Sequence, residues 1–291
     1  MGYSIDQFSK ITGISKLVLR TWENRYNFLT PSRTNTNIRS YSDKLLVNAL
    51  NAKLLVDSGY KISFISKQEE AKINDLINGI KNYDKEKKYQ FFINKIIQSG
   101  IDFNTNLFNK IYNECLLNFD IIEFYKQIML PSLSRIGLFW LTNRISPAQE
   151  HFLSEMFKQK LYSEINNTKN FDINNSKTWI LFLPPDEHHE LGLLFSRLLL
   201  LQKGHNVIYL GANVPLSGLT QVTDVMKVDN ILFFSISNIS QLDLPNTIDY
   251  LNKKLLKQSK FLVTRKNKDI LSTSGLTIIN SIEHFISIIS D

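Results

Sequence analysis

The segment Asp186-Glu187-His188-His189-Glu190-Leu191-Gly192 stands between a predicted strand and a predicted helix. The apolar run 179–183 before it is typical of a buried strand, and a proline pair ends that run. The amphipathic stretch 192–204 after it predicts a helix. In an open α/β sheet, the carboxyl end of a strand is the usual place for a ligand. We therefore expect a ligand site on this turn.

The C-terminal part of the chain, residues 176–291, alternates predicted strands with predicted helices. The strands are expected at 179–183, 206–210, 231–235, 260–264 and 276–279. This alternation predicts a parallel α/β domain of the Rossmann-like or flavodoxin-like kind.

The spacing Glu187-x-His189-x-x-Gly192 resembles the cobalamin-binding signature Asp/Glu-x-His-x-x-Gly. The resemblance implies that His189 is the lower ligand of the cobalt, that Glu187 orients its imidazole, and that Gly192 lets cofactor and backbone approach closely. The chemistry agrees, because a neutral ring nitrogen binds a metal while a carboxylate on the other nitrogen fixes the tautomer. A solvated turn is the alternative for a short cluster of His and Glu, and the rest of the chain decides between the two.

Two later segments bear on the same site. The third predicted strand ends in Ser235-Ile236-Ser237, which partly matches the serine segment of cobalamin-binding modules, so Ser235 and Ser237 are expected to contact the cofactor. In such modules a glycine pair follows the fourth strand and gives room to the nucleotide tail of the cofactor. Residues 263–267 of this chain contain no glycine. Side chains there would crowd the tail and reduce the affinity for the cofactor.

The N-terminal residues 5–24 have the pattern of a helix-turn-helix. Ser4 and Gln7 form a capping box that opens the first helix. Gly13 suits a tight turn, and Ser15 caps the second helix.

The second helix has two different faces. Its apolar face recurs at i, i+3 and i+7 and is expected to pack inward: Leu19, Trp22 and Tyr26. Lys16, Arg20 and Asn24 form a polar stripe of the kind that enters a DNA major groove. A solvated helix face is the alternative for such a stripe.

Three motifs follow one another here: Leu19-Arg20-x-Trp22-Glu23-x-Arg25-Tyr26, Pro31-x-Arg33-Thr34 and Arg39-x-Tyr41-Ser42. Their order and spacing over residues 3–66 resemble the winged helix-turn-helix of the MerR family. The resemblance implies a DNA-binding domain at 1–70 whose wing, about 31–41, holds the phosphate backbone with arginines, which bind phosphate bidentately. It implies these DNA-contacting residues: Lys16, Arg20, Arg25, Tyr26, Arg33, Arg39 and Tyr41. Asn35-Thr36-Asn37 stands where this family usually has glycines, so we expect a wing of altered shape.

The middle of the chain predicts a linker and a bundle of helices. Residues 71–84 are polar and rich in charge and are expected to form a linker, helical in part. Helical patterns follow at 85–98, 103–116, 121–141 and 147–165. Because the connections are short, they predict an antiparallel four-helix bundle at 85–168.

Trp140 is followed after nine residues by Glu150-His151. This Trp-x9-Glu-His spacing resembles the helical cap of cobalamin-dependent MerR-type regulators, the CarH/LitR-like branch. The resemblance implies that Trp140, Glu150 and His151 pack around the upper ligand of the cobalt, typically 5′-deoxyadenosyl, and so implies adenosylcobalamin as cofactor. Core packing of Trp140 is the alternative. Leu141 stands where some light-sensing members carry a histidine that can bind cobalt after photolysis, so a light response by that route is not expected.

The composition limits the class of protein. With 43% hydrophobic and 21% charged residues, the chain is typical of a soluble protein. The lone Cys115 excludes a disulfide framework and a multi-cysteine metal site. The N-terminus lacks the pattern of a signal peptide, and the longest apolar run, 191–201, is too short to span a bilayer. The net charge of +7 permits a polyanionic partner without requiring one.

These observations predict a multi-domain α and α/β protein: winged helix-turn-helix, four-helix bundle cap and Rossmann-like domain. The family resemblance implies a cytoplasmic transcriptional regulator, a repressor, whose promoter binding is modulated by a cobalamin, and in some members by light, through oligomerisation. The partners implied are double-stranded promoter DNA, a second copy of the chain in a dimer or tetramer, and RNA polymerase, with no membrane. Two alternatives remain: a regulator whose sensor no longer binds cobalamin, and a corrinoid methyl-carrier enzyme. The second is disfavoured by the DNA-binding module and by the lack of any catalytic domain.

Overall fold

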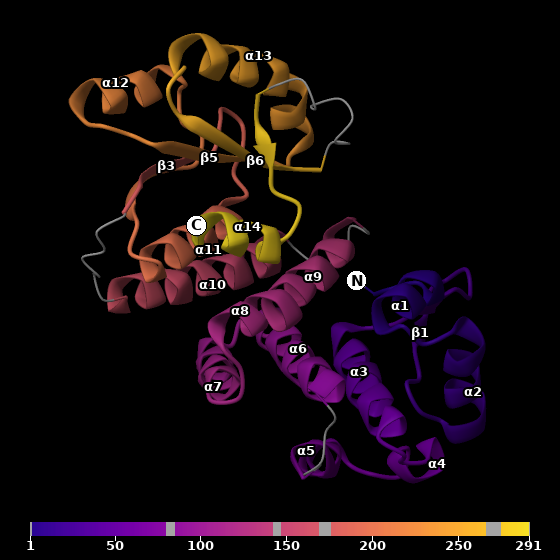
Figure 1. The fold of residues 1–291 in the computed structure, drawn as a ribbon. Helices are drawn as coiled ribbons and strands as arrows, with labels where there is room; N and C mark the ends of the chain where they lie inside the picture. The colour runs from indigo at the N-terminus through magenta and orange to yellow at the C-terminus, as the bar shows by residue number, and fades with distance from the viewer. Residues whose placement is uncertain (1, 80–84, 142–146, 169–175, 266–274, 291) are drawn as a thin grey trace. The chain divides into compact units, whose positions relative to one another are not determined.

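The computed structural model describes residues 2–79, 85–141, 147–168, 176–265 and 275–290. The chain divides into two compact units, Met1–Met156 and Phe157–Asp291 (Figure 1). Within the described residues, no helix has the length and apolar character that crossing a membrane requires.

The first unit begins with a winged helix-turn-helix, as the sequence predicts. Its elements are α1 (Ile5–Thr12), α2 (Lys16–Tyr26), β1 (Ser32–Arg33), β2 (Arg39–Ser40), α3 (Asp43–Asp57) and α4 (Ile62–Ile65). The predicted capping box between Ser4 and Gln7 forms, and Gly13 ends α1 in the left-handed conformation at φ 66°. The strands β1 and β2 pair antiparallel and form the wing.

A small aromatic core fixes these elements. Phe8 of α1 stacks on Tyr41, with 4.3 Å between the ring centroids. The backbones of Tyr3 and Tyr41 pair as an isolated bridge that ties the N-terminus to the end of the wing. On α2, Leu19 and Trp22 are buried as expected, whereas Tyr26 is only half-buried.

The bundle follows. Its helices are α6 (Lys85–Ile101), α7 (Thr105–Leu116), α8 (Ile121–Phe124), α9 (Leu130–Leu141) and α10 (Pro147–Asn167). The prediction of one continuous helix at 121–141 is wrong in one respect, because the π-helix η1 (Tyr125–Met129) interrupts it. The wider turn keeps Tyr125, Ile128 and Met129 all buried, which a period of 3.6 residues does not reveal.

The segment before the bundle is partly helical. The helix α5 (Glu70–Asn78) overlaps the linker expected at 71–84 and packs on α3, and its Ile73 and Ile77 are buried. Residues 80–84 lie outside the described part of the chain. Lys95 of α6 donates a hydrogen bond to the side chain of Asn74 in α5 at 3.0 Å, so α5 contacts the bundle as well as α3.

Polar contacts tie α3 to the bundle. The buried Asn94 of α6 donates its side-chain amide to the carbonyl of Leu50 in α3 at 3.2 Å. Arg135 of α9 donates to Gln90 and to Asn94 on α6, and burial lowers the pKa of this guanidinium. A cavity of about 370 Å³ lies at this junction, lined by residues of α1, α3, α6 and α9. Helices α3, α6 and α9 therefore pack as one body.

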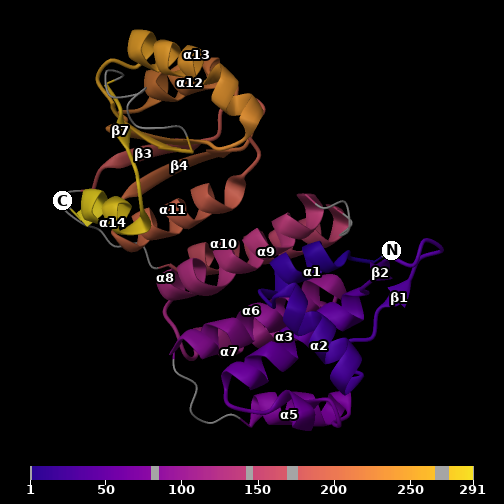
Figure 2. The ribbon, with the colours of Figure 1, turned by 90° about the vertical axis from the view of Figure 1, so that its right-hand side faces the viewer.

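The second unit contains a five-stranded parallel sheet, confirming the predicted α/β class. Its elements are β3 (Thr178–Phe182), α11 (Glu190–Gln202), β4 (Asn206–Gly211), α12 (Ser217–Val225), β5 (Asn230–Ser235), α13 (Asn238–Lys254), β6 (Ser259–Thr264), β7 (Thr277–Ile278) and α14 (Ile282–Ser290). The strand order β4-β3-β5-β6-β7 is that of flavodoxin-like folds. Helices α12 and α13 cover one face of the sheet, and α11 and α14 cover the other (Figures 1 and 2).

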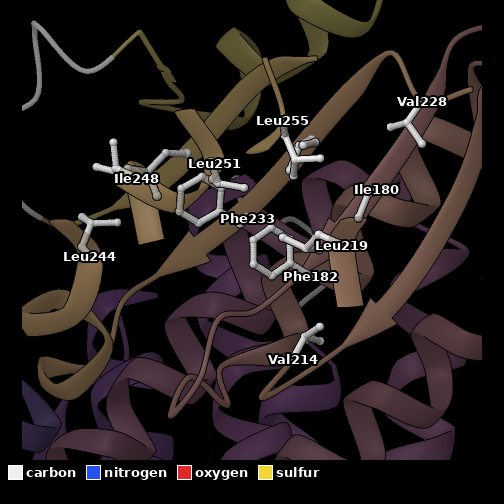
Figure 3. Close-up of a cluster of buried hydrophobic side chains, with 12 residues drawn as sticks. Ile180, Phe182, Val214, Leu219, Val228, Phe233, Leu244, Ile248, Leu251 and Leu255 are labelled. Carbon is white, nitrogen blue, oxygen red and sulfur yellow. The ribbon is translucent and has the colours of Figure 1, made fainter. Parts of the chain in front are cut away.

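Alternate strand residues fill the two sides of this sheet. Phe182 and Phe233 stack at 5.4 Å between ring centroids on the side of α12 and α13, within the cluster drawn in Figure 3. Trp179 packs on Phe261 and Phe285 on the opposite side. The strands β3 and β5 are buried on both faces, which explains their nearly unbroken apolar sequences.

Candidate functional site

The predicted ligand turn lies at the switch point of the sheet. After β3 the chain crosses through α11 to β4 on one side, and after β4 it returns to β5 on the other side. Ligands of open α/β sheets bind where the strand order reverses in this way, at the carboxyl ends of the strands. Here the loop after β3 carries Glu187 and His189, and the loop after β5 carries Ile236 and Ser237.

Glu187 joins the two loops. One carboxylate oxygen, Oε2, accepts hydrogen bonds from the backbone N–H groups of Ile236 (2.6 Å) and Ser237 (2.7 Å) and from the hydroxyl of Ser240 (2.6 Å). The other, Oε1, accepts from the backbone N–H groups of His188 and His189 at 3.0 and 3.1 Å. The side chain is fully buried, so these bonds replace all of its hydration.

The imidazole of His189 completes this arrangement, with Nδ1 2.6 Å from Glu187 Oε1. Burial alone would raise the pKa of Glu187, but hydrogen bonds from His189, Ser240 and the two backbone N–H groups hold it well below its ordinary value. Glu187 is therefore an ionised acceptor, and Nδ1 carries the proton. This tautomer leaves the lone pair on Nε2 for a metal.

The exposure of His189 agrees with that role, since 57% of its side chain is accessible. The side chain of His188 is also exposed and has no hydrogen-bonding partner among the described residues. Only His189 of the pair is therefore oriented by a carboxylate. No group of three or more His, Cys, Asp or Glu able to hold a bare ion occurs among the described residues. One histidine ligand fits a metal that arrives in its own macrocycle, as in a cobalamin.

Gly192 has a packing reason of its own. A Cβ atom built at this position would lie 2.6 Å from Cε1 of Phe234 on β5. The glycine therefore lets the first turn of α11 approach β5. The expectation that Gly192 also makes room for the cofactor stays a prediction.

Glu190 is a residue that the sequence reasoning passed over. It accepts a hydrogen bond from the hydroxyl of Tyr209 at 2.8 Å and pairs with Lys158 at 3.3 Å. These contacts fix the start of α11, for which His189 is the N-cap residue. The partners lie on β4 and α10, so no local pattern in the sequence could have revealed them.

Ser235 and Ser237 lie around the carboxylate of Glu187. Ser235 is fully buried, and its hydroxyl lies 3.1 Å from that of Ser240. Ser237 caps α13 and donates its hydroxyl to the carbonyl of Asp186 at 3.3 Å. Ser240, which the sequence reasoning missed, links this pair to Glu187. Of the segment expected to crowd the nucleotide tail, Arg265 is exposed, and residues from 266 on lie outside the described part.

The cap residues are placed in part. The side chain of Trp140, at the end of α9, lies outside the described residues. Glu150 and His151 lie near the start of α10, 3.7 Å apart between Oε2 and Nδ1. Ser154 donates its hydroxyl to Glu150 at 2.6 Å, and 75% of the His151 side chain is exposed. Their contact with an upper ligand stays a prediction.

The expected DNA-contacting residues of α2 face solvent. Lys16, Arg20 and Arg25 are exposed, and Lys16 pairs with Asp6 of α1. The guanidinium of Arg25 lies 5.6 Å from the ring centroid of Tyr26. This helix therefore presents a basic outer face.

Glu23 of α2 connects this helix to the wing. Its carboxylate accepts a hydrogen bond from Arg39 Nε at 2.6 Å and lies 3.5 Å from Arg33 Nη2. Arg33 also donates to the side chain of Asn37 at 3.0 Å, and Asn37 turns the wing at φ 61°. Asparagine thus takes the left-handed position in a wing that lacks glycine. The wing arginines are held in place by one carboxylate that is itself nearly buried.

Tyr41 corrects the expected set of DNA-contacting residues. Its side chain is fully buried against Phe8, and its hydroxyl has no hydrogen-bonding partner among the described residues. Tyr41 therefore lies in the core of the winged helix-turn-helix, where its hydroxyl cannot reach a phosphate.

We expect different outcomes when the two wing arginines are replaced by alanine. Arg33→Ala should weaken binding to every duplex and flatten the slope of log K against log salt by about 0.9, the contribution of one phosphate contact. Arg39→Ala should do the same and also lower the melting temperature, because it leaves the nearly buried Glu23 without its shortest hydrogen bond. Lys110→Ala, which removes an exposed charge on α7, is the control. Unchanged salt slopes in both arginine variants would exclude the wing from the interface.

Comparisons with known proteins cover both units. Residues 3–72 match the model of the MerR HTH family regulatory proteins, and residues 92–163 match that of the B12 binding domain. The chain is 25% identical to the HTH-type transcriptional repressor CarH of Myxococcus xanthus over 262 residues, 87% of this chain and 85% of that protein. It is 24% identical to the repressor CarA of the same organism over 222 residues, 75% of this chain and 71% of that protein. A monomethylamine corrinoid protein of Methanosarcina barkeri aligns with a TM-score of 0.57 at 13% identity, over 69% of this chain and 98% of that one, and so shares the fold.

Proposed function

Because the chain is a MerR-family regulator with a CarH/LitR-like cobalamin-binding module, we propose that it represses transcription at promoters and that adenosylcobalamin sets its affinity for DNA. The observation that carries this proposal is the hydrogen bond of 2.6 Å between Glu187 and His189. The chain is a regulator and not an enzyme, and it acts where the promoter DNA is, in the cytoplasm.

The residues of the turn have distinct tasks in this proposal. Glu187 holds the proton on Nδ1 of His189, so Nε2 stays neutral and directed away from the carboxylate. Glu190 fixes the first turn of α11 behind His189 through Tyr209 and Lys158. A bound cobalamin would supply a cobalt able to bind a neutral imidazole, and Nε2 of His189 would be the atom of this chain that holds it.

The upper face belongs to the cap in this proposal. Trp140 shields the adenosyl group, and Glu150 and His151 offer it polar contacts. The preference for adenosylcobalamin over other cobalamins rests on these three residues. Leu141 has no metal-binding atom, so it would not hold a cobalt.

Binding at the cap is transmitted to DNA through the first unit. Asn94 of α6 contacts the backbone of α3 directly, and Arg135 of α9 holds Asn94 in place. A shift of α6 or α9 therefore moves α3 and the core that supports the wing. We expect the DNA-bound form to be a dimer or tetramer on a palindromic site, with RNA polymerase as the machinery it obstructs.

A regulator with a decayed sensor is the alternative, and the structure disfavours it. The absence of glycine after β6 would be its support. A decayed site has no need of a carboxylate that accepts hydrogen bonds from two loops and an imidazole, yet Glu187 keeps all of them. The glycine-free segment is expected to lower affinity for cobalamin rather than abolish it.

Absorbance spectroscopy tests the cofactor assignment. Wild-type protein titrated in the dark should bind adenosylcobalamin more tightly than methylcobalamin, because in this proposal Trp140, Glu150 and His151 recognise the adenosyl group. Trp140→Ala should remove most of this preference while leaving the melting temperature of the bundle nearly unchanged. Phe64→Ala, which removes a 44% exposed aromatic side chain on α4, is the control. Equal affinity of the wild type for both cobalamins would refute a cap that recognises the upper ligand.

A further inference from the structure

The outer face of α2 carries a side chain that the polar stripe does not explain. Leu17 is 76% exposed, although it lies on an ordered helix with a buried apolar face. At about 100° per residue, Leu17 lies roughly 160° around the helix from Leu19 and roughly 140° from Trp22. Leu17 therefore lies near the centre of the helix face that is turned away from the core.

Cations and hydrogen-bonding groups surround this leucine. On the same helical projection, Arg20 lies about 60° from it and Asn24 about 20°. Thr21 lies one turn further along, and its hydroxyl donates a hydrogen bond to the backbone carbonyl of Leu17 at 2.9 Å. The polar groups suit phosphates and base edges, whereas Leu17 in their midst leaves 76% of its surface exposed in the free protein.

The DNA major groove offers one prominent apolar group, the 5-methyl of thymine, and aliphatic side chains recognise it by contact. We propose that Leu17 reads a thymine methyl at one position of each half-site. The proposal rests on the DNA binding proposed above and adds a residue and a base to it. Lys16 and Arg20 anchor the helix electrostatically, and Leu17 supplies discrimination among bases.

Deoxyuridine gives a direct test, because it lacks only the methyl group of thymine. The probe is a duplex selected from a random library by the full-length protein. Each thymine of one half-site is replaced in turn by deoxyuridine. At one position the wild type should lose about fourfold in affinity, the amount expected for one buried methyl. Leu17→Ala should bind the thymine and deoxyuridine duplexes equally.

Two controls separate this effect from others. Leu117→Ala removes a leucine of similar exposure at the end of α7 and should keep the fourfold discrimination. The melting temperature of Leu17→Ala should match that of the wild type, because Leu17 contributes little to the core. The assignment of Leu17 is overturned if the wild type binds the duplex but does not discriminate thymine from deoxyuridine at any position. It is also overturned if Leu17→Ala keeps that discrimination. In both cases the proposal of DNA binding still holds. If the full-length protein selects and binds no duplex at all, both the role of Leu17 and the proposed DNA binding are overturned.

Discussion

Substitution of His189 by alanine should abolish the spectrum of histidine-ligated cobalamin and weaken cofactor binding by at least a hundredfold. His189 is the imidazole whose Nδ1 is held by a carboxylate at 2.6 Å, which leaves Nε2 for the metal. Removal of a metal ligand with such a supporting partner has consequences of this size or larger. Absorbance titration with adenosylcobalamin measures both the affinity and the ligation state.

The neighbouring histidine is the matched control. His188 is exposed and contributes only its backbone N–H to Glu187, so His188→Ala should change the affinity less than threefold. The two substitutions remove the same chemical group from adjacent positions. Equal losses in both variants would show that the turn as a whole, and not one ligand, holds the cofactor.

Substitution of Glu187 should have the second large effect, both on the stability of the second unit and on cobalamin binding. Glu187→Ala leaves backbone N–H groups of two loops and the hydroxyl of Ser240 without their acceptor. Unsatisfied buried donors cost about 1–3 kcal/mol each, and entering water recovers part of that. We expect a loss of about 3 kcal/mol in the free energy of unfolding of the second unit, together with loss of cobalamin binding.

The pH dependence of this effect has a definite sign. The pKa of Glu187 is lowered in the folded state, so between its folded and unfolded values the unfolded chain binds more protons and stability rises with pH. The stabilisation of wild type over Glu187→Gln should therefore be constant above about pH 5 and should shrink as the pH falls below about 4, toward the folded pKa. Urea unfolding at several pH values measures it.

A control for this pH experiment is available in the same unit. Asp224→Asn removes an exposed carboxylate on α12 and should leave the profile unchanged. A difference between wild type and Glu187→Gln that does not vary with pH would mean that the carboxylate is not ionised in the folded protein.

The sequence predicted those features that depend on local rules. Ser4 and Gln7 signal the start of α1 because a capping box is a contact between residues three apart. The apolar runs 179–183 and 231–235 signal central parallel strands because both faces of such strands are buried. The pairing of Glu187 with His189 was implied by the resemblance to the cobalamin-binding signature, and the structure places the two side chains in contact.

The sequence did not predict features that depend on contacts between residues far apart in the chain. Tyr41 sits in a DNA-binding motif, and only the packing of Phe8 shows that it is buried. Glu190 finds its partners on β4 and α10, and Ser240 reaches Glu187 from another loop. The π-helix η1 buries Tyr125, Ile128 and Met129 together in the bundle. The local sequence from Tyr125 to Met129 does not reveal this wider turn.

The central claim is that a cobalamin bound at His189 sets the affinity for promoter DNA. The most direct measurement is the dissociation constant of full-length protein for its selected duplex, in the dark, with and without saturating adenosylcobalamin. We predict a change of at least tenfold for the wild type and for His188→Ala, and no change for His189→Ala. Wild-type protein that stays colourless in excess adenosylcobalamin and binds the duplex with the same constant would contradict the account.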